Sequence, residues 1–330
     1  MAVPSRKQKI PELARRFIVP PFSVLDARQG YWMERKRAWL SLGFSSGKGR
    51  CAKLLFNSSA QGTNIYGFRN KLRAQLGRQP NWEETLAAAR NAGFTLQGQT
   101  SIFDPVLCEA VYRWFCPLGG VILDPFAGGS VRGIVACRLG RHYVGIDLRK
   151  RQVRENVRQA GLVRLPFQPS WVCGDALKVE TLAPGAYDLV FSCPPYADLE
   201  VYSRDRRDLS TMPYPAFLEA YGRIIAASMA LLRRDRFACF VVGNIRDKAG
   251  RYRNLVADTV AAFEAAGAAF YNDAVLLTPL GSVPVRAGKQ FLALRKLGKC
   301  HQNVLVFVKG DARAAVAACG QIVPAGDTPP

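Results

Sequence analysis

The stretch VILDPFAGGS, residues 121–130, decides the fold of this chain. A short apolar run typical of a buried strand leads directly into Gly128 and Gly129, and a helical pattern begins at Val131. Glycines at a strand-to-helix turn let the backbone approach a ligand closely, at the sheet edge where α/β proteins bind ligands. The turn matches neither the GxGxxG of dinucleotide enzymes nor the GxxxxGK phosphate loop.

The surrounding pattern predicts a mainly parallel sheet. Short β-branched runs alternate with helical stretches, and this alternation is typical of an α/β domain. The predicted strands are 121–124, 143–147, 171–174, 188–193, 237–243, 271–278 and 303–309. The predicted helices are 105–115, 131–139, 150–160, 215–232 and 254–266. No long helix separates the last two strands, which predicts an antiparallel edge.

Acidic residues end the next two predicted strands. Asp147 follows Asp124 by 23 residues, where a carboxylate is placed to accept hydrogen bonds from ribose hydroxyls. Asp175 follows the third strand and can either face an adenine amino group or cap the helix after it. Together with the glycine turn, these residues favour an adenosyl ligand that lacks a pyrophosphate.

The fourth strand ends in Cys193-Pro194-Pro195-Tyr196. Consecutive prolines fix the backbone, and they leave carbonyls without competing N–H donors. Such carbonyls can accept hydrogen bonds from an amino group and hold its nitrogen toward an electrophile. Tyr196 can stack on a base that is turned out of a nucleic-acid helix.

These residues resemble the DNA adenine-N6 and cytosine-N4 methyltransferases. The family motifs DPFxGxG and (D/N/S)PP(Y/F) correspond to residues 124–130 and 193–196. Phage and bacterial methylases with a CPPY motif are also similar at DLEVYS (198–203), VVGNIRD (241–247) and KCHQN (299–303). The resemblance implies a Rossmann-like class I S-adenosylmethionine-dependent methyltransferase with seven mostly parallel strands. The stretch PPFSVLDARQGYW (20–32) is similar too, but no role follows for it.

The resemblance also implies the site residues. The expected S-adenosylmethionine contacts are Phe103, Asp104, Asp124, Pro125, Phe126, Ala127, Gly128, Gly129, Ser130, Asp147, Leu148, Asp175 and Ala176. The expected catalytic residues are Ser192, Cys193, Pro194, Pro195 and Tyr196, with no metal ion. Two positions depart from the family. Gly128-Gly129-Ser130 replaces the commoner GSG turn, and Cys193 stands where Asp, Asn or Ser accepts an amino hydrogen. Thiol sulfur is a weak acceptor, so Ser192 or a backbone carbonyl is expected to substitute, or catalysis is slower.

Charge points to a polyanionic partner. The net charge is +21 and the pI about 10.0. Residues 1–100 hold 17 Lys or Arg against five Asp or Glu. A second basic run, Arg286, Lys289, Arg295, Lys296 and Lys299, has no acidic residue within it. Because neutralised phosphates release counterions, double-stranded DNA is the expected partner. An anionic membrane would need an amphipathic anchor, which does not accompany the charge.

The expected organisation has three parts. A basic N-terminal extension spans 1–100, with helices near 31–42 and 82–92. The methyltransferase domain spans 101–310, and 311–330 is a flexible tail. Only about 18 residues separate Asp175 from Cys193, too few for a recognition domain. The extension and the basic loop at 281–299 are therefore the candidates for DNA recognition.

We expect a DNA amino-methyltransferase, with adenine favoured over cytosine, of the kind found in restriction–modification systems or phages. RNA and protein-glutamine methyltransferases share the PPY-type motif, and a degenerate DNA-binding homologue is a further alternative. Cytosine C5 chemistry is disfavoured because it uses a Pro-Cys order. Nine cysteines without a repeated CxxC and two histidines predict no zinc site. The N-terminus lacks a signal peptide and no apolar run reaches about 18 residues, so a cytoplasmic location is expected. Target sequence and oligomeric state stay open.

Overall fold

The computed structural model describes residues 10–45, 62–92, 103–199, 201–203, 205–280 and 283–324. The chain forms two compact units. Unit 1 comprises Met1–Ser46, Phe103–Pro279 and Cys300–Pro330, and unit 2 comprises Gly47–Ile102 and Leu280–Lys299. The units therefore do not follow the three consecutive segments expected from the sequence. Residues 10–45 belong with the sheet, whereas the basic run near 290 belongs with residues 62–92.

Unit 1 is built on an eight-stranded sheet in the order β1-β9-β10-β6-β5-β2-β3-β4. The strands are β1 (Val24–Asp26), β2 (Val121–Asp124), β3 (His142–Asp147), β4 (Ser170–Cys173), β5 (Tyr187–Ser192), β6 (Leu232–Val242), β9 (Ala269–Leu277) and β10 (His301–Lys309). β10 runs antiparallel to both of its neighbours, and the other pairs are parallel. This topology confirms the predicted Rossmann-like class I methyltransferase fold. One strand more is present than expected, because β1 extends the sheet beyond β9.

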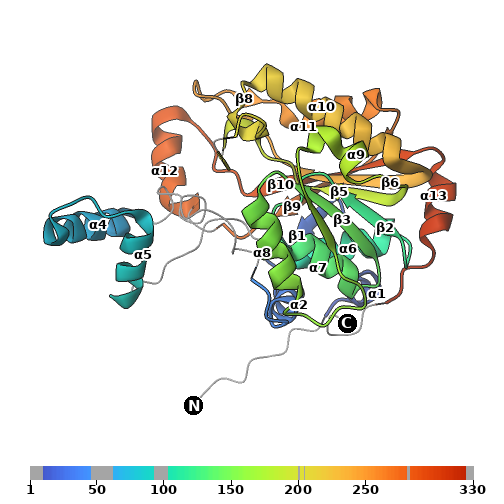
Figure 1. Cartoon of the computed structure of the whole chain (residues 1–330), viewed down its shortest axis with the longest axis horizontal. Coiled ribbons are helices and arrows are strands. Elements are labelled where there is room, and N and C mark those ends of the chain that lie inside the picture. The colour runs from blue at the N-terminus through green and yellow to red at the C-terminus, as the bar shows by residue number, and fades with distance from the viewer. Residues whose placement is uncertain are drawn as a thin grey trace, which may run out of the picture. The chain divides into compact units, whose positions relative to one another are not determined.

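Helices cover both faces of this sheet (Figure 1). They are α6 (Pro105–Phe115), α7 (Val131–Arg138), α8 (Lys150–Ala160), α9 (Val179–Leu182), α10 (Tyr214–Leu231) and α11 (Leu255–Ala265). Buried side chains of α6 and α7 share one apolar cluster, and those of α10 and α11 share another. Short elements complete the connections: η2 (Ala176–Lys178), η3 (Ala197–Leu199), η4 (Leu209–Thr211), β7 (Ile245–Arg246) and β8 (Tyr252–Arg253).

The N-terminal segment is an integral part of unit 1. It contributes α1 (Glu12–Phe17), β1 and α2 (Gly30–Leu40), and α2 packs on α6. In this interface Arg35 forms a buried ion pair with Glu109 at 2.7 Å, and Trp39 Nε1 donates to the same carboxylate at 2.8 Å. A buried charge is tolerated when it is paired and hydrogen-bonded. The stretch 20–32 thus has a structural role, since it forms β1 and begins α2.

The C-terminal residues are also more ordered than the expected tail. α13 (Ala312–Cys319) follows β10 and packs against β6. The Asp311 side chain caps this helix by accepting from the N–H of Ala314 at 2.8 Å, and Ala315 is buried. The prediction of a flexible tail over 311–330 is therefore wrong for 312–319. An N-cap followed by small helix-forming residues gives the physical reason.

Unit 2 contains the helices α4 (Gly62–Leu76), α5 (Trp82–Asn91) and α12 (Val283–Leu294). Gly77, with φ of +65°, ends α4, and Asn81 opens α5. Asn81 and Glu84 form a reciprocal capping box at 2.8 and 3.0 Å. α12 lies where a basic loop was expected. Apolar residues at 283, 287, 291 and 294 follow helical spacing, which the charges of this stretch obscure. No helix among the described residues has the length and apolar character needed to cross a membrane.

Candidate active site

The glycine turn after β2 is held by the neighbouring strand and by α8. Gly128 adopts φ of +51°, a left-handed conformation that glycine accepts without strain. Its carbonyl accepts from Asn156 Nδ2 of α8 at 2.8 Å. The N–H of Ala127 donates to the carbonyl of Ile146 in β3 at 2.9 Å. The turn is therefore fixed at the carboxyl edge of the sheet, where the sequence predicts a ligand.

Asp124, at the end of β2, is completely buried and surrounded by donors. Its carboxylate accepts from Arg132 Nε at 2.5 Å, from the Tyr143 hydroxyl at 2.6 Å and from the Ser192 hydroxyl at 2.5 Å. The N–H of Phe126 adds a bond of 3.2 Å. These contacts give Asp124 an organising role, since it joins β2, β3, β5 and α7 beneath the turn. The hydroxyl of Ser192 donates its proton within this network, and Ser192 is completely buried, so its role as a substitute acceptor stays a prediction.

Arg132 also belongs to this site, although no local sequence pattern identifies it as a site residue. It is 5% exposed, and its guanidinium donates to the carbonyls of Phe126 and Ala127 at 2.6 and 3.0 Å. Burial alone would lower the pKa of Arg132, but the Asp124 carboxylate raises it, so the group stays charged. The guanidinium also lies 4.6 Å from the ring centroid of Phe103. Arg132 therefore fixes the backbone of the glycine turn through its hydrogen bonds to these two carbonyls.

Asp147 ends β3 beside the glycine turn. Its carboxylate is 12% exposed and accepts from the N–H of Arg149 at 2.8 Å. Burial raises the pKa of Asp147, although the Arg149 charge and the N–H groups of Arg149 and Gly128 oppose this rise. Such a carboxylate gains from further hydrogen-bond donors. Leu148 follows it, and its carbonyl lies 3.7 Å from the Cys173 sulfur.

The other expected cofactor contacts divide into two groups. Asp104 and Asp175 act as helix caps, accepting from the N–H groups of Val106 and Leu177 at 2.9 and 3.0 Å. Asp104 also binds Lys36 at 2.8 Å, so its carboxylate serves the α2–α6 interface. The remaining expected contacts are Phe103, Pro125, Phe126, Gly129, Ser130 and Ala176, which lie before α6, within the turn or at the start of η2.

Ser130 stands out among these residues because its hydroxyl is buried without a partner. The side chain is 0% exposed, and its oxygen makes no hydrogen bond within the described part of the chain. Ser130 is also the N-cap residue of α7, yet it forms no side-chain cap bond. Buried hydroxyls are normally hydrogen-bonded, so this one is a candidate for contact with a ligand or water.

The Cys193–Tyr196 segment leaves β5 next to β2. These two strands pair in parallel, with Leu123 opposite Val190. The sulfur of Cys193 lies 3.8 Å from the Tyr196 hydroxyl. Burial raises the pKa of Tyr196 well above its usual value, and Cys193 adds to this rise. The phenol is therefore neutral at physiological pH and is no general base.

Gln302 is a further site residue without an assigned role in the sequence. Its Nε2 donates to the Tyr196 hydroxyl at 2.5 Å. The two residues are 106 positions apart, and they meet because β10 lies on the far side of β6 from β5. The KCHQN motif contains Gln302, but the motif alone does not indicate what the side chain contacts.

The expected DNA-binding residues lie in unit 2. Lys289 and Arg295 are exposed, whereas Lys296 and Lys299 are partly buried. Burial lowers the pKa of Lys299. The side chain of Arg286 lies outside the described residues, as does Glu200 of the DLEVYS motif. The described residues include no group of three or more His, Cys, Asp or Glu side chains that could hold a metal ion.

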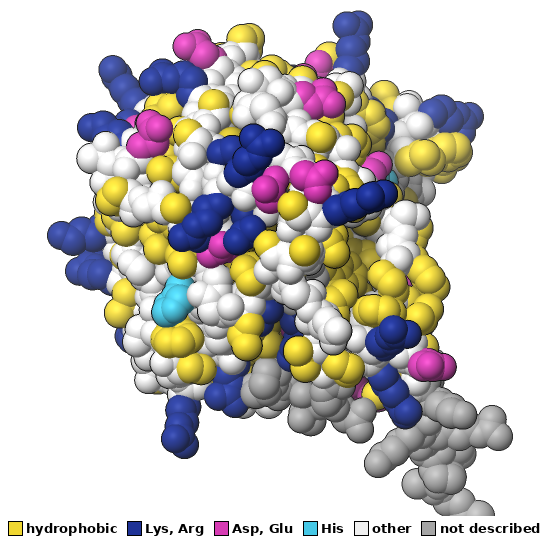
Figure 2. Space-filling view, turned by 90° about the vertical axis from the view of Figure 1, so that its right-hand side faces the viewer, with side chains coloured by type: hydrophobic (Ala, Val, Ile, Leu, Met, Phe, Trp, Pro, Cys, Tyr) yellow, Lys and Arg dark blue, Asp and Glu magenta, His cyan; other side chains and the backbone are white. Residues whose placement is uncertain are grey.

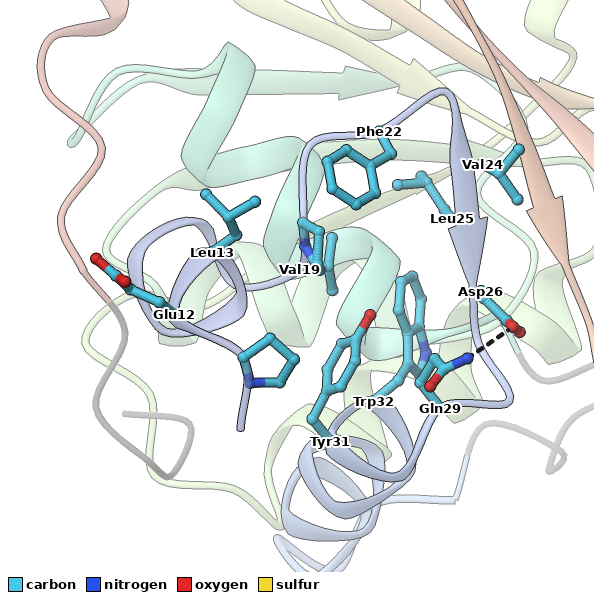
Figure 3. Close-up of a pocket in the computed structure, with 12 residues that line it drawn as sticks. Glu12, Leu13, Val19, Phe22, Val24, Leu25, Asp26, Gln29, Tyr31 and Trp32 are labelled. Atoms are coloured by element: carbon cyan, nitrogen blue, oxygen red, sulfur yellow. Dashed lines mark hydrogen bonds between the residues drawn. The ribbon is translucent and has the colours of Figure 1, made fainter. Parts of the chain in front are cut away.

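A separate pocket of about 410 Å³ lies in the N-terminal segment of unit 1. Residues between Pro11 and Trp32 line it, and Figure 3 shows the rings of Phe22, Tyr31 and Trp32 among them. Burial raises the pKa of Tyr31. None of the glycine-turn or Cys193–Tyr196 residues belongs to this pocket.

Comparisons with known proteins give fold-level similarity alone. No protein-family model matches the chain, and no curated protein matches its sequence. Among solved structures, TrmN from Thermus thermophilus is 17% identical with a TM-score of 0.43, and the match covers 64% of this chain and 50% of TrmN. Magnesium protoporphyrin IX methyltransferase from Synechocystis, with bound S-adenosylmethionine, is 15% identical, with a TM-score of 0.41 and coverage of 64% and 87%. A candidate DNA modification methylase from Thermus thermophilus is 22% identical, with a TM-score of 0.31 and coverage of 42% and 51%. This chain thus spans half the length of TrmN, and its function has to be argued from its own site.

Proposed function

We propose that this protein transfers a methyl group from S-adenosylmethionine to the exocyclic amino group of a base in DNA, with adenine favoured over cytosine. The observation that carries the proposal is the pairing of two motifs at one sheet edge. The glycine turn and the Cys193–Tyr196 segment leave adjacent strands, and the 2.5 Å bond between Ser192 and Asp124 ties them together.

The residues around the turn fit an adenosyl group. Gly128 leaves open space where a Cβ would stand, with only the Phe126 carbonyl at 4.0 Å. The buried Ser130 hydroxyl lacks a partner among the described residues, and Asp147 can accept from ribose hydroxyls. When bound, S-adenosylmethionine supplies an electrophilic methyl group on a sulfonium. Asp124 and Arg132 contribute indirectly, because they fix the backbone of the turn.

The second motif suits an amino group as the acceptor of the methyl. Pro194 is buried and Pro195 partly buried, so their carbonyls act as hydrogen-bond acceptors in surroundings with little water. Holding the amino nitrogen in line with the methyl group lowers the entropic part of the barrier. Tyr196 offers a neutral aromatic surface for the base, and Gln302 fixes its hydroxyl. The amino group loses a proton as it is methylated, and the carbonyl oxygens accept the hydrogen bond from that proton before it passes to solvent.

Transfer of labelled methyl groups by the purified chain tests this function. We expect label from S-adenosylmethionine to enter duplex DNA, and Tyr196→Ala to abolish the transfer while S-adenosylmethionine still binds. Duplex RNA, transfer RNA and a protein extract serve as parallel acceptors. Labelling of one of these in place of DNA would move the assignment to another methyltransferase class, and failure to bind S-adenosylmethionine would overturn it.

A further inference from the structure

Unit 2 carries a disproportionate share of the positive charge. Its two segments, 47–102 and 280–299, contain 13 Lys or Arg and two Glu. They account for +11 of the net +21 in 76 of the 330 residues. Unit 1 holds 33 Lys or Arg against 23 Asp or Glu, and on the face drawn in Figure 2 the acids stand between the cations. A surface rich in unbalanced cations favours a polyanion, because each phosphate that it neutralises releases counterions.

Within unit 2, the cations that can reach a ligand stand on α4 and α12. Lys71 and Arg73 on α4 and Lys289 on α12 are exposed, and none of them forms an ion pair with another described residue. Neither helix contains an acidic residue. α5 differs, since its first turn is acidic and Glu84 pairs with Arg78 at 2.9 Å. Contact with phosphates is therefore expected at α4 and α12 rather than at α5.

α12 and the residues directly after it also offer apolar side chains beside their cations. Leu292, Leu294 and Leu297 are 77%, 63% and 72% exposed. The guanidinium of Arg295 lies 5.2 Å from the ring centroid of Phe291. DNA-binding surfaces use such apolar groups against base edges or between base steps. Basic and apolar side chains side by side suit a nucleic acid, which presents both phosphates and bases, better than a ligand that is bound by charge alone.

Three of the four chain connections of unit 2 lie near the candidate active site. The second segment leaves unit 1 after β9 and returns into β10, and the N–H of Thr278 donates to the Cys300 carbonyl at 3.0 Å, where the two connections meet. Two residues later, Gln302 binds the Tyr196 hydroxyl. The first segment returns at Phe103, whose ring lies beside Arg132. Three of the four connections between the units therefore leave unit 1 at the edge at which the base is proposed to react. The fourth follows Ser45, whose N–H donates to Gln159 at the C-terminal end of α8 at 2.6 Å.

From these observations we infer that unit 2 binds duplex DNA, and that basic side chains of α4 and α12 contact its phosphates. The inference rests on the proposed function, and it adds which residues hold the substrate. It joins two stretches that lie about 200 positions apart in the sequence into a single binding unit.

Charge reversal in the full-length chain tests the inference. The variant Lys71→Glu/Arg73→Glu/Lys289→Glu changes three exposed cations of unit 2. Its matched control, Arg154→Glu/Arg223→Glu/Arg313→Glu, makes the same charge change at exposed positions of unit 1. Binding to a duplex DNA oligonucleotide is measured from about 0.05 to 0.2 M salt, and S-adenosylmethionine binding by calorimetry reports whether unit 1 is folded.

We expect the unit 2 variant to bind DNA at least about tenfold more weakly, with the slope of log K against log salt reduced by about 0.9 for each phosphate that is no longer neutralised. The control should keep a slope close to that of the wild type, and both variants should bind S-adenosylmethionine normally. Equal weakening by the two variants would overturn the inference, as would unchanged binding by the unit 2 variant or tighter binding of duplex RNA than of DNA by the wild type. If the wild type methylates DNA while the inference fails, the proposed function still stands. If the wild type neither binds nor methylates DNA, the proposed function itself fails.

Discussion

Replacing Gln302 by leucine isolates the contact that holds Tyr196. The substitution removes the 2.5 Å hydrogen bond from Gln302 Nε2, so among the described residues the hydroxyl of the partly buried Tyr196 keeps only the Cys193 sulfur as a hydrogen-bond partner. Leaving a buried hydroxyl without its partner costs about 1–3 kcal/mol. If this cost adds to the activation free energy of methyl transfer, kcat drops by roughly 5- to 150-fold, because each 1.4 kcal/mol of barrier changes the rate about tenfold.

A double-mutant cycle separates positioning from general damage. Tyr196→Phe removes the hydroxyl but keeps the ring, and we expect the double variant to be little worse than Gln302→Leu alone, since both polar partners are then absent. Single-turnover methylation rates give the coupling, and calorimetry with S-adenosylmethionine gives the control, which should be unchanged. Strictly additive effects on kcat would refute a positioning role for Gln302. A loss of S-adenosylmethionine affinity that matches the loss of kcat would refute it as well.

The remaining predictions concern the turn and the base platform. Asp124→Asn should lower the free energy of unfolding by about 3–5 kcal/mol, because it leaves the buried charge of Arg132 without its partner; urea denaturation measures this, and Asp273→Asn, at an exposed position, should change little. Since burial raises the pKa of Asp147, we expect S-adenosylmethionine affinity to fall as the pH drops through that pKa, and Asp147→Asn to flatten the dependence. The same raised pKa means that the charged form opposes folding above it, so Asp147→Asn should stabilise the ligand-free protein near neutral pH; a destabilised variant would contradict this. Tyr196→Ala should lose most methyl transfer yet retain the cofactor, and unchanged turnover would contradict its role.

The fold could be predicted from the sequence because its signals are local. α6 spans Pro105–Phe115 and β2 spans Val121–Asp124, as the apolar periodicity predicts. β1 escaped prediction since three residues cannot show an alternating pattern, and the strand exists through pairing with β9. The prediction of a loop at α12 was wrong, because the basic residues of this stretch interrupt the apolar pattern that indicates a helix.

The candidate site was predictable only in part for a related reason. The glycine turn and the Cys193–Tyr196 motif are contiguous in sequence, so they could be recognised. The partners that fix them come from distant positions: Arg132 and Tyr143 bind Asp124, and Gln302 arrives from β10. Asp104 shows the converse, because the family resemblance implied a cofactor contact whereas its carboxylate caps α6 and binds Lys36 of α2. Long-range pairing of buried polar groups leaves no periodic trace in the sequence.

Nucleoside mass spectrometry tests the central claim most directly. Plasmid DNA from a methylation-deficient bacterial host that expresses this chain would be digested and compared with DNA from the same host expressing Tyr196→Ala. We predict a new N6-methyladenine peak, or an N4-methylcytosine peak, that is absent with the variant. The absence of both from wild-type DNA, while the purified chain binds S-adenosylmethionine, would contradict methylation of DNA and direct the assignment to another acceptor.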